Sequence, residues 1–409
     1  MSHATERFGL DPLLVLLFFA LASGGAWVLW RAFGRQDGPW ADLAGSSSQK
    51  LAQLQGMRGI LAMAVVAHHA CCWYYFLQSG TWSTGPSVLF DHLGNFGVLQ
   101  FFYLSGFLFW RKLIRHNRLP ASSFYLSRFL RIGPVYYVSI GAAILLGLTI
   151  TGLPLHVPLG NFLASLTPWL IFSIGGRPNV NHADILRISC GVTWTLALEW
   201  LFYLSLPFLG WFSRKAWRFG VYVAAFGALY VLSRLVRESS AASTSLIAIA
   251  SGAATYSKFM LIGFGGGILV AATEGNLRLW LRGLERSGNW IALGCYGLYL
   301  LTPGHEGLGQ VLLQAPFAFV ALGADLFGFL TSSCARLLGA ISYPVYLVHG
   351  IVYYAAMLLR GGMHEVGLGA YLAESVACLA AILVLATALH LFVERPTMKI
   401  SEQIAHAAR

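Results

Sequence analysis

Long apolar segments alternate with short polar ones along almost the whole chain. Eleven segments approach the roughly 20 mostly apolar residues that a helix needs to cross a bilayer: 10–31, 57–78, 93–113, 133–152, 193–212, 217–234, 256–273, 289–303, 309–330, 337–358 and 368–392. Their apolar residues are continuous and do not alternate with polar ones, unlike the strands of a membrane β-barrel. The pattern predicts an all-α, polytopic integral membrane protein with about eleven transmembrane helices.

Basic residues in the polar connections give the expected topology. When the segments are counted from an external N-terminus, most of the 27 lysines and arginines fall on the cytoplasmic side, as the positive-inside rule requires. The same count places the C-terminus in the cytoplasm. Topology therefore accounts for the net charge of +11, and we expect no nucleic-acid partner. The predicted location is a bacterial inner membrane.

Composition supports this class and adds little chemistry. The chain is 57% hydrophobic and 11% charged, whereas a soluble protein carries about 25% charged residues. The six cysteines form no CxxC pattern and no metal-ligand spacing, so we expect neither a disulfide framework nor a metal site.

The polar residues 34–50 read as a cytoplasmic linker that separates a first helix, within 1–33, from the rest of the chain. Residues 153–192 read as an external excursion, part re-entrant or interfacial, because counting them as a span would place a basic cluster outside.

The segment RGILAMAVVAHH carries ionisable residues into an apolar helix. Arg58 and His69 are eleven residues apart, which is three helical turns plus about 20°, so they share one face. This spacing puts Arg58 near the cytoplasmic surface and His69 about 16 Å deeper, near the middle of the bilayer. Arg58 also fits a snorkelling anchor, and His69 a packed histidine with a hydrogen-bond partner. His68 points about 100° away, and we expect it to pack or to hydrogen-bond to a neighbouring helix.

Further ionisable residues lie at predicted membrane depth. Arg128 and Arg131 are three apart in SRFLRIGPVYY and share a helix face, which suits phosphate recognition or a positive-inside cluster. Glu199 lies seven residues into a span that is entered from outside. His349 lies twelve residues into a span that is entered from inside. Two histidines and a glutamate in the membrane interior indicate a reaction centre or a proton path.

Six segments together resemble membrane-bound acyltransferase family 3, the O-acyltransferases of bacterial surface polysaccharides and related acceptors. They occur in the family's order: QGMRGILAMAVVAHH, FGVLQFFYLSGFLFWRK, FYLSRFLRIGPVYY, VTWTLALEWLFYLSLP, ISYPVYLVHG and FVERP. The resemblance covers residues 51–397, so 1–33 would add one helix to a ten-helix core and 398–409 would form a cytoplasmic tail. The chain departs from the family at Gln55 and Leu99, where Asp is common, and at Trp200–Leu201, where Glu-Gln is common.

The resemblance implies a reaction and roles for residues. An acyl-CoA donor, most often acetyl-CoA, would enter from the cytoplasm and acylate a hydroxyl of a glycan or lipid-linked acceptor. Histidine suits a general base near neutral pH, so His69 would be the catalytic base, with Glu199 orienting it or the acceptor. The remaining implied residues are Arg58, Arg128 and Arg131 for the donor phosphates, and His349, Ser105 and Tyr346 as further site candidates.

Two other functions fit part of the pattern. A proton-coupled transporter or flippase of an envelope precursor also uses buried His and Glu, although the chain shows no two-fold repeat. A catalytically inactive family member could act as a membrane binding partner, although the Arg58–His69 pair is retained. Membrane lipid, a partner protein and a second copy of the chain are the other expected partners.

Overall fold

The computed structural model describes residues 11–33, 51–116, 121–152, 154–212, 216–238, 244–281, 287–302, 304, 307–362 and 364–407. Helices make up most of these residues. Among them, the β pairing is one isolated bridge between Val180 and Ala183. The predicted all-α class is therefore confirmed. The predicted linker 34–50 lies outside the described residues.

Each of the eleven predicted apolar segments contains a helix. The helices are α2 (Asp11–Phe33), α4 (Ala52–Ser79), α5 (Val88–His116), α6 (Ala121–Thr151), α9 (Thr193–Phe212), α10 (Ala216–Glu238), α11 (Thr244–Lys258), α12 (Gly265–Ala272), α14 (Gly288–Leu300), α15 (Leu308–Leu322), α16 (Ser333–Ala340), α17 (Ser342–Leu359) and α18 (Leu368–Leu389). A π-helix, η3 (Phe259–Phe264), joins α11 to α12, and another, η4 (His390–Glu394), joins α18 to α19 (Arg395–Ala407). The predicted segment 309–330 is too long, because α15 ends at Leu322 and an irregular stretch follows.

Seven helical stretches of the described chain are long and apolar enough to cross a membrane. They are Asp11–Ala32, Ala52–Ser79, Val88–Arg115, Ser122–Thr151, Ile249–Ala272, Ser342–Leu359 and Leu368–Ile404. Shorter apolar helices occur at Gly220–Val236 and Leu308–Leu322. The chain is thus a polytopic membrane protein by length and composition of its helices.

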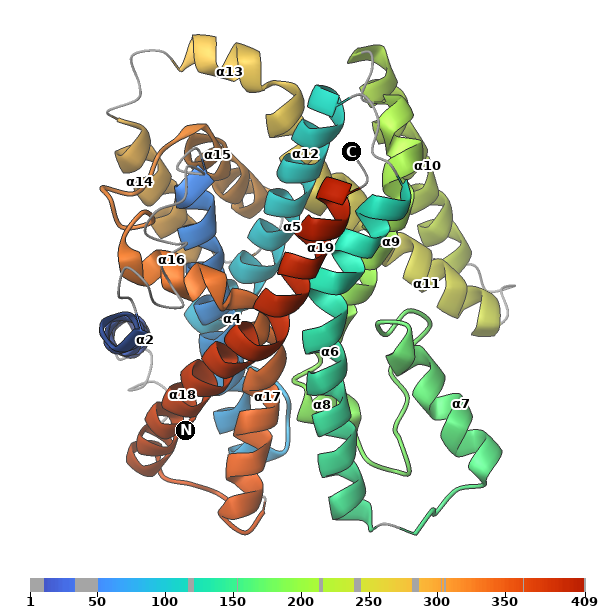
Figure 1. Cartoon of the computed structure of the whole chain (residues 1–409), viewed down its shortest axis with the longest axis vertical. Helices are drawn as coiled ribbons and strands as arrows, with labels where there is room; N and C mark the ends of the chain where they lie inside the picture. The colour runs from blue at the N-terminus through green and yellow to red at the C-terminus, as the bar shows by residue number, and fades with distance from the viewer. Residues whose placement is uncertain are drawn as a thin grey trace. The chain divides into compact units, whose positions relative to one another are not determined.

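The chain divides into two compact units, and the first contains residues 1–98, 126–196 and 287–409. In this unit α4 packs against α16 and α17, and α17 packs against α18. Figure 1 shows α2 end-on, whereas α4, α6 and α17 run lengthwise up the view. The first helix therefore crosses these helices steeply and contacts α16, α18 and α4.

Glycines bring the start of α4 into backbone contact with the region of α16. A Cβ on Gly56 would overlap the carbonyl of Leu330, and one on Gly339 would overlap the carbonyl of Gln55. A Cβ on Gly59 would lie 2.6 Å from the backbone nitrogen of Gly339. Small residues allow helices to approach this closely. The seam formed by these three glycines fixes the position of α4, the helix that carries Arg58 and His69.

The predicted excursion 153–192 contains a short helix and an irregular return. Helix α7 (Leu159–Leu170) has 12 residues and contains Pro168. The hydroxyl of Tyr136 on α6 donates to the carbonyl of Trp169 over 2.7 Å, so the end of α7 is tied to α6. Helix α8 (Ile185–Ile188) follows, and Asp184 caps it by accepting from the Arg187 amide over 3.0 Å. The excursion is thus anchored on the first unit by specific hydrogen bonds.

The second unit contains residues 99–125 and 197–286. Its centre includes the stacked rings of Phe202 and Phe264, whose centroids lie 4.0 Å apart. Gly106 lets α5 approach the backbone of Phe264, where a Cβ would overlap the carbonyl. The Arg111 guanidinium pairs with Glu274 of α13 (Glu274–Trp280) over 3.0 Å. Aromatic packing and one ion pair thus hold α5, α9, α12 and α13 together.

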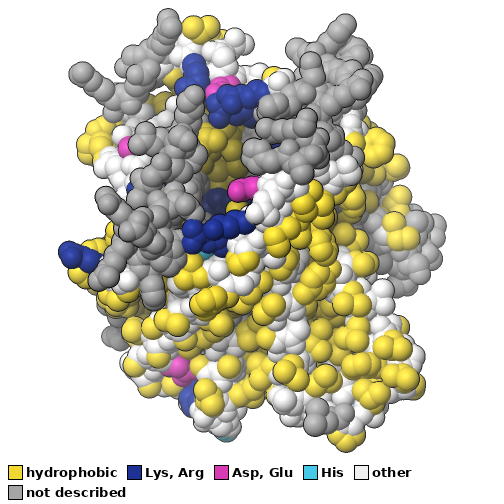
Figure 2. Space-filling model, in the orientation of Figure 1, with side chains coloured by type: hydrophobic (Ala, Val, Ile, Leu, Met, Phe, Trp, Pro, Cys, Tyr) yellow, Lys and Arg dark blue, Asp and Glu magenta, His cyan; other side chains and the backbone are white. Residues whose placement is uncertain are grey.

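The surface of the first unit has the character expected for lipid contact. In Figure 2 the lower part of the view, over α6, α7 and α18, is largely hydrophobic. Exposed apolar side chains there include Leu145, Leu163 and Val384, which are 61%, 54% and 62% exposed. A soluble monomer rarely exposes so large an apolar surface to water. This face is where the bilayer would contact the unit.

Candidate functional site

Helix α4 carries the candidate base. It runs without a proline from Ala52 to Ser79, and Gly80 ends it in the left-handed conformation with its amide bonded to the Phe76 carbonyl over 2.8 Å. The unbroken helix keeps Arg58 and His69 on one face, three turns apart. Arg58 is half-buried near the start of the helix. The predicted geometry within this helix is therefore confirmed.

The structure brings His69 together with His349 of α17, 280 residues away in sequence. His69 Nδ1 and His349 Nε2 lie 3.0 Å apart, and the two rings stack with centroids 5.0 Å apart. His349 is fully buried, and its Nδ1 lies 3.2 Å from the Val345 carbonyl. The two histidines that the sequence singled out separately thus form one pair.

The hydrogen bonds of this pair define its proton positions. A carbonyl only accepts, so His349 Nδ1 carries the proton that is donated to Val345. In a neutral ring the other nitrogen then accepts, so His349 Nε2 accepts from His69 Nδ1–H. In neutral His69 the lone pair that can accept a proton is therefore on Nε2. An acceptor hydroxyl at that atom would meet a base in the correct tautomer.

His68 has a packing role on the neighbouring face of α4. Its Nδ1 donates to the Phe90 carbonyl of α5 over 2.9 Å, and its Nε2 lies 3.6 Å from the Cys72 sulfur. A Cβ on Gly94 would lie 2.6 Å from the His68 ring, so that glycine makes room for the imidazole. The expected hydrogen bond to a neighbouring helix is confirmed.

Tyr346 lies one helical turn before His349, with ring centroids 6.2 Å apart. Its hydroxyl lies 2.8 Å from the Thr195 hydroxyl, which donates to the Val192 carbonyl over 2.9 Å. The Tyr346 hydroxyl also lies 3.4 Å from the Val192 carbonyl, so it donates its proton either to Thr195 or to that carbonyl. These contacts hold the ring and engage the phenol proton, so Tyr346 supports the wall of the site beside His349.

The arginines predicted to bind the donor lie at the starts of two helices. Arg128 and Arg131 are one turn apart on α6 and are half-buried, and Arg128 Nη2 donates to the Ser127 hydroxyl over 3.3 Å. The Tyr343 hydroxyl at the start of α17 donates to the Ile132 carbonyl over 2.7 Å. The helix that carries His349 is thus tied to α6 next to Arg131.

Glu199 and Ser105 belong to the second unit, whereas both histidines belong to the first. The Glu199 carboxylate accepts a short hydrogen bond from the Tyr203 hydroxyl, one turn further along α9. Ser105 lies on α5 and is half-buried. The structure therefore places these two candidates within their own unit, and their roles stay predictions.

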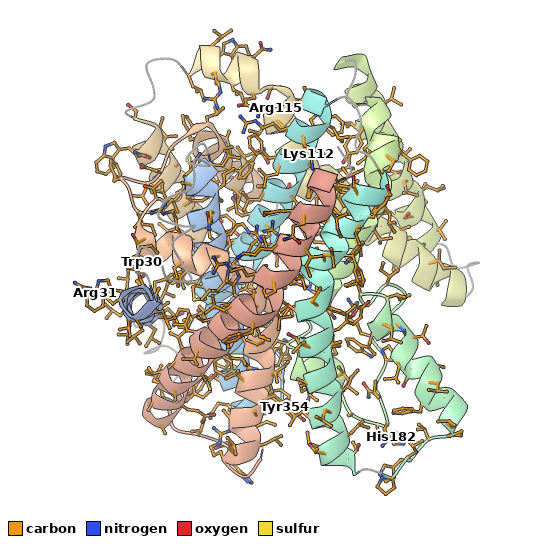
Figure 3. All side chains as sticks on the ribbon, in the orientation of Figure 1. Trp30, Arg31, Lys112, Arg115, His182 and Tyr354 are labelled. Carbon is orange, nitrogen blue, oxygen red and sulfur yellow. The ribbon has the colours of Figure 1, made fainter. Side chains whose placement is uncertain are left out.

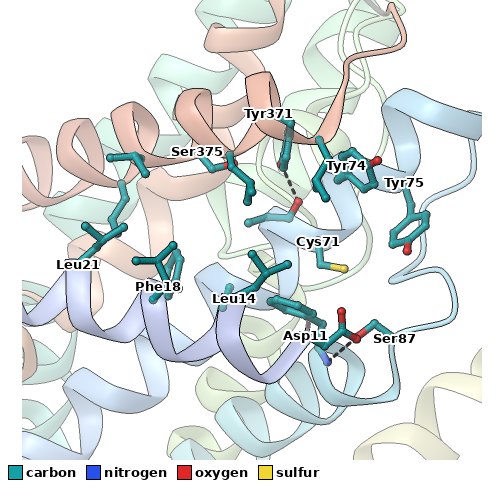
Figure 4. A pocket seen from close by; sticks show the side chains of 18 residues that line it. Asp11, Leu14, Phe18, Leu21, Cys71, Tyr74, Tyr75, Ser87, Tyr371 and Ser375 are labelled. Carbon is teal, nitrogen blue, oxygen red and sulfur yellow. Dashed lines mark hydrogen bonds between the residues drawn. The ribbon is translucent and has the colours of Figure 1, made fainter. Parts of the chain in front are cut away.

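An apolar pocket of about 120 Å³ lies between α2, α4 and α18. Figure 4 shows Phe18 and Cys71 at this pocket, with the Tyr371 hydroxyl bonded to the Ala70 carbonyl over 2.6 Å. The pocket-lining residues of α4 recur at positions 67, 70, 71 and 74, one face of the helix. His69 lies about 200° around the helix from position 67. The pocket is thus on the opposite side of α4 from the candidate base.

The sequence reasoning missed an aromatic cluster beside His69. Trp82, in the loop after α4, has its ring centroid 6.2 Å from His69 and 5.2 Å from Trp73. Trp73 donates from its indole nitrogen to the Cys190 sulfur over 3.2 Å. The sequence does not predict which residues a tryptophan in a loop between two spans will contact, because tertiary packing alone decides where the loop lies.

Cysteine chemistry finds little support at this site. Burial raises the pKa of the Cys190 thiol, so the thiolate nucleophile is suppressed near neutral pH. Within the part of the chain that the structure describes, no group of three or more His, Cys, Asp or Glu side chains could hold a metal ion. The histidine pair can carry out acid–base chemistry.

Comparisons with known proteins place the chain in a family. The model of an acyltransferase domain matches residues 51–391. The exopolysaccharide production protein ExoZ of Rhizobium meliloti (strain 1021) is 28% identical over 319 residues, which cover 75% of this chain and 90% of ExoZ. Nodulation protein 10 of Rhizobium leguminosarum bv. viciae is 32% identical over 183 residues, 42% of this chain, and the chain spans about half (48%) of that protein. No solved structure matches. The chain belongs to membrane-bound acyltransferase family 3.

Proposed function

We propose that the chain transfers an acyl group from cytosolic acyl-CoA to a hydroxyl of a cell-envelope polysaccharide. The observation that carries this proposal is the pair of half-buried His69 and buried His349, which presents an unprotonated His69 Nε2. Family membership supports acyl transfer, and the similarity to ExoZ, an exopolysaccharide production protein, supports an exopolysaccharide as the acceptor class. Acetyl is the proposed acyl group because it is the commonest in the family.

The proposed reaction needs one base. His69 Nε2 takes the proton of the acceptor hydroxyl while the oxygen attacks the thioester carbonyl carbon. The carbon–sulfur bond breaks, and the His69 imidazolium returns the proton to the CoA thiolate. The products are an ester and free CoA, and the base is regenerated. His349 acts as a positioning residue, since it contacts His69 and holds its tautomer.

The donor would be bound by charge at the starts of α4 and α6. Arg58, Arg128 and Arg131 are half-buried cations, and guanidinium groups bind phosphate oxygens with two parallel hydrogen bonds. The helix spacing puts Arg58 about 16 Å along α4 from His69, so an extended donor could place phosphates at one end and its thioester at the other.

The proposed setting is a bacterial inner membrane with an external N-terminus and a cytoplasmic C-terminus. In this topology the donor comes from the cytoplasm, and the loop with Trp82 faces the acceptor on the other side. A transporter or flippase remains a second reading of buried His and Glu, but the family match does not support it. A second copy of the chain and a partner protein are further proposed partners.

The test is acyl transfer by the purified full chain. The donor is labelled acetyl-CoA, and the acceptor is polysaccharide extracted from a strain that lacks the chain, so its sites are unmodified. We expect label in the polysaccharide with wild type and a loss of about 10²–10⁴-fold with His69→Ala, the usual contribution of a positioned base. His364→Ala, at an exposed loop histidine, is the matched control and should retain activity. Full activity of His69→Ala would exclude the proposed base.

A further inference from the structure

Trp82 presents a flat apolar surface beside the proposed base. It lies in the loop between α4 and α5 and is 37% exposed, whereas Trp73 behind it is 1% exposed. The planes of Trp82 and His69 are inclined by 34°, with centroids 6.2 Å apart. Trp82 meets Trp73 edge to face, with an interplanar angle of 87°. A partly exposed indole is thus held in a fixed orientation next to His69.

A second aromatic contact fixes the other side of this ring. Phe76, one turn after Trp73 on α4, has its centroid 5.9 Å from Trp82. Tyr354 of α17, labelled in Figure 3, lies 5.8 Å from Trp73. Edge-to-face contacts at these separations are favourable for aromatic rings. The supporting rings therefore come from both helices that carry the histidine pair.

Charged side chains border the aromatic cluster. The Arg187 guanidinium lies over the Phe76 ring, with its carbon 4.4 Å from the centroid. Arg187 also pairs with Asp184 over 3.4 Å, and their side chains are 39% and 41% exposed. This gives a flat aromatic surface with a carboxylate and a guanidinium beyond it. A sugar ring has complementary chemistry, since its C–H face is apolar and its edge carries hydroxyls.

We propose that Trp82 is an acceptor-binding residue that stacks against a sugar ring of the polysaccharide. This inference rests on the proposed function, because it assigns a subsite to the same reaction. Stacking on Trp82 would place a sugar ring next to His69, whose ring centroid lies 6.2 Å from the indole. Asp184 and Arg187 would bind hydroxyls of the neighbouring part of the glycan.

A tryptophan near a membrane surface can also serve as an interfacial anchor. Two observations favour a sugar subsite over that role. The ring is close to the catalytic pair, and an exposed ion pair lies next to its supporting Phe76. A tryptophan that only anchors the protein at the membrane surface needs neither a nearby catalytic pair nor a nearby ion pair. The two roles also differ in a measurable way, since loss of an anchor leaves acceptor affinity unchanged.

The experiment compares Trp82→Ala, Trp82→Phe and Trp290→Ala with wild type. Trp290 on α14 is 67% exposed and packs on Phe327 with centroids 4.6 Å apart, so it is a matched exposed tryptophan. All proteins are purified in a detergent without a sugar head group, since such a head group would compete for the subsite. Initial rates are measured with labelled acetyl-CoA and the unmodified polysaccharide described above, over a range of polysaccharide concentrations.

We expect Trp82→Ala to raise the KM for polysaccharide about tenfold, the scale of one aromatic contact. The KM for acetyl-CoA should stay within twofold of wild type. Trp82→Phe keeps a flat ring and should raise the acceptor KM less than threefold, and Trp290→Ala should match wild type. Where Trp82→Ala fails to accumulate, Trp82→Leu supplies apolar bulk without a flat ring and should show the same rise.

An acceptor KM that is unchanged in Trp82→Ala, or in Trp82→Leu, would overturn the subsite and leave Trp82 as an anchor. Failure of the proposed function looks different. In that case wild type transfers no label to polysaccharide, or His69→Ala transfers as much as wild type. The Trp82 proposal fails alone when wild type and His69→Ala behave as proposed and only the expected rise in KM is missing.

Discussion

Replacing His349 tests whether it positions His69. His349→Phe keeps a buried aromatic ring but removes the nitrogen that accepts from His69 Nδ1 at 3.0 Å. A net hydrogen bond contributes about 0.5–1.5 kcal/mol, and a buried donor left without a partner costs about 1–3 kcal/mol. Because about 1.4 kcal/mol changes a rate tenfold, we expect kcat to fall roughly 10–100-fold. The KM for acetyl-CoA should not change, since the proposed phosphate contacts lie elsewhere.

Two variants separate positioning from packing. His349→Gln supplies an amide oxygen that can accept from His69, so it should recover at least tenfold of the kcat that His349→Phe loses. His92→Phe is a matched control, because His92 is 1% exposed and bonded to the Val88 carbonyl over 2.8 Å on α5. Thermal unfolding of all three reports their folding. Equal kcat values for His349→Phe and His349→Gln, in folded proteins, would refute the tautomer argument.

Three further outcomes follow from the described contacts. Gly94→Leu should lower the free energy of unfolding by about 1–3 kcal/mol, measured by denaturant titration in detergent, because its side chain would meet the His68 ring. Gly141→Ala, where a Cβ meets nothing within 4 Å, should be neutral or stabilising, and equal losses would contradict the steric reading. Cys190→Ala should keep kcat within about threefold, because burial raises the pKa of that thiol and opposes a nucleophilic role; abolished turnover would show otherwise. Arg128→Gln should raise the KM for acetyl-CoA about tenfold or more, as one charge-assisted hydrogen bond is lost, and an unchanged KM would remove Arg128 from the donor site.

The pattern of apolar residues was sufficient to predict where the long helices lie and which residues share a face within one helix. The apolar runs predicted eleven segments that each contain a helix, although α7, α8, α13 and α19 form outside them. The spacing of Arg58 and His69 gave their common face. The end of the segment 309–330 was missed because the apolar run continues past Leu322, where the helix ends at Gly323 with a φ of 131°. Apolar composition alone cannot separate a helix from a buried irregular stretch.

Contacts between distant segments could not be derived from periodicity. The sequence marked His69 and His349 as unusual at membrane depth, but their pairing depends on how α17 packs against α4. Glu199 was expected to orient His69 or the acceptor; its carboxylate accepts from Tyr203 within the second unit, and its role stays a prediction. Trp82 is part of no sequence pattern, because its ring neighbours His69, Trp73 and Phe76 lie on α4 whereas Trp82 lies in the loop that follows.

The glycine seam between α4 and the α16 region has a consequence for the conformational cycle. Transport by alternating access requires one group of helices to rock against another around the substrate. Backbone atoms in contact at Gly56, Gly59 and Gly339 interlock, and separating them would open voids that no side chain fills. We therefore expect α4 to stay stationary through turnover. Donor and acceptor would each diffuse to a fixed His69 from opposite sides, with the membrane crossed by the acyl group alone.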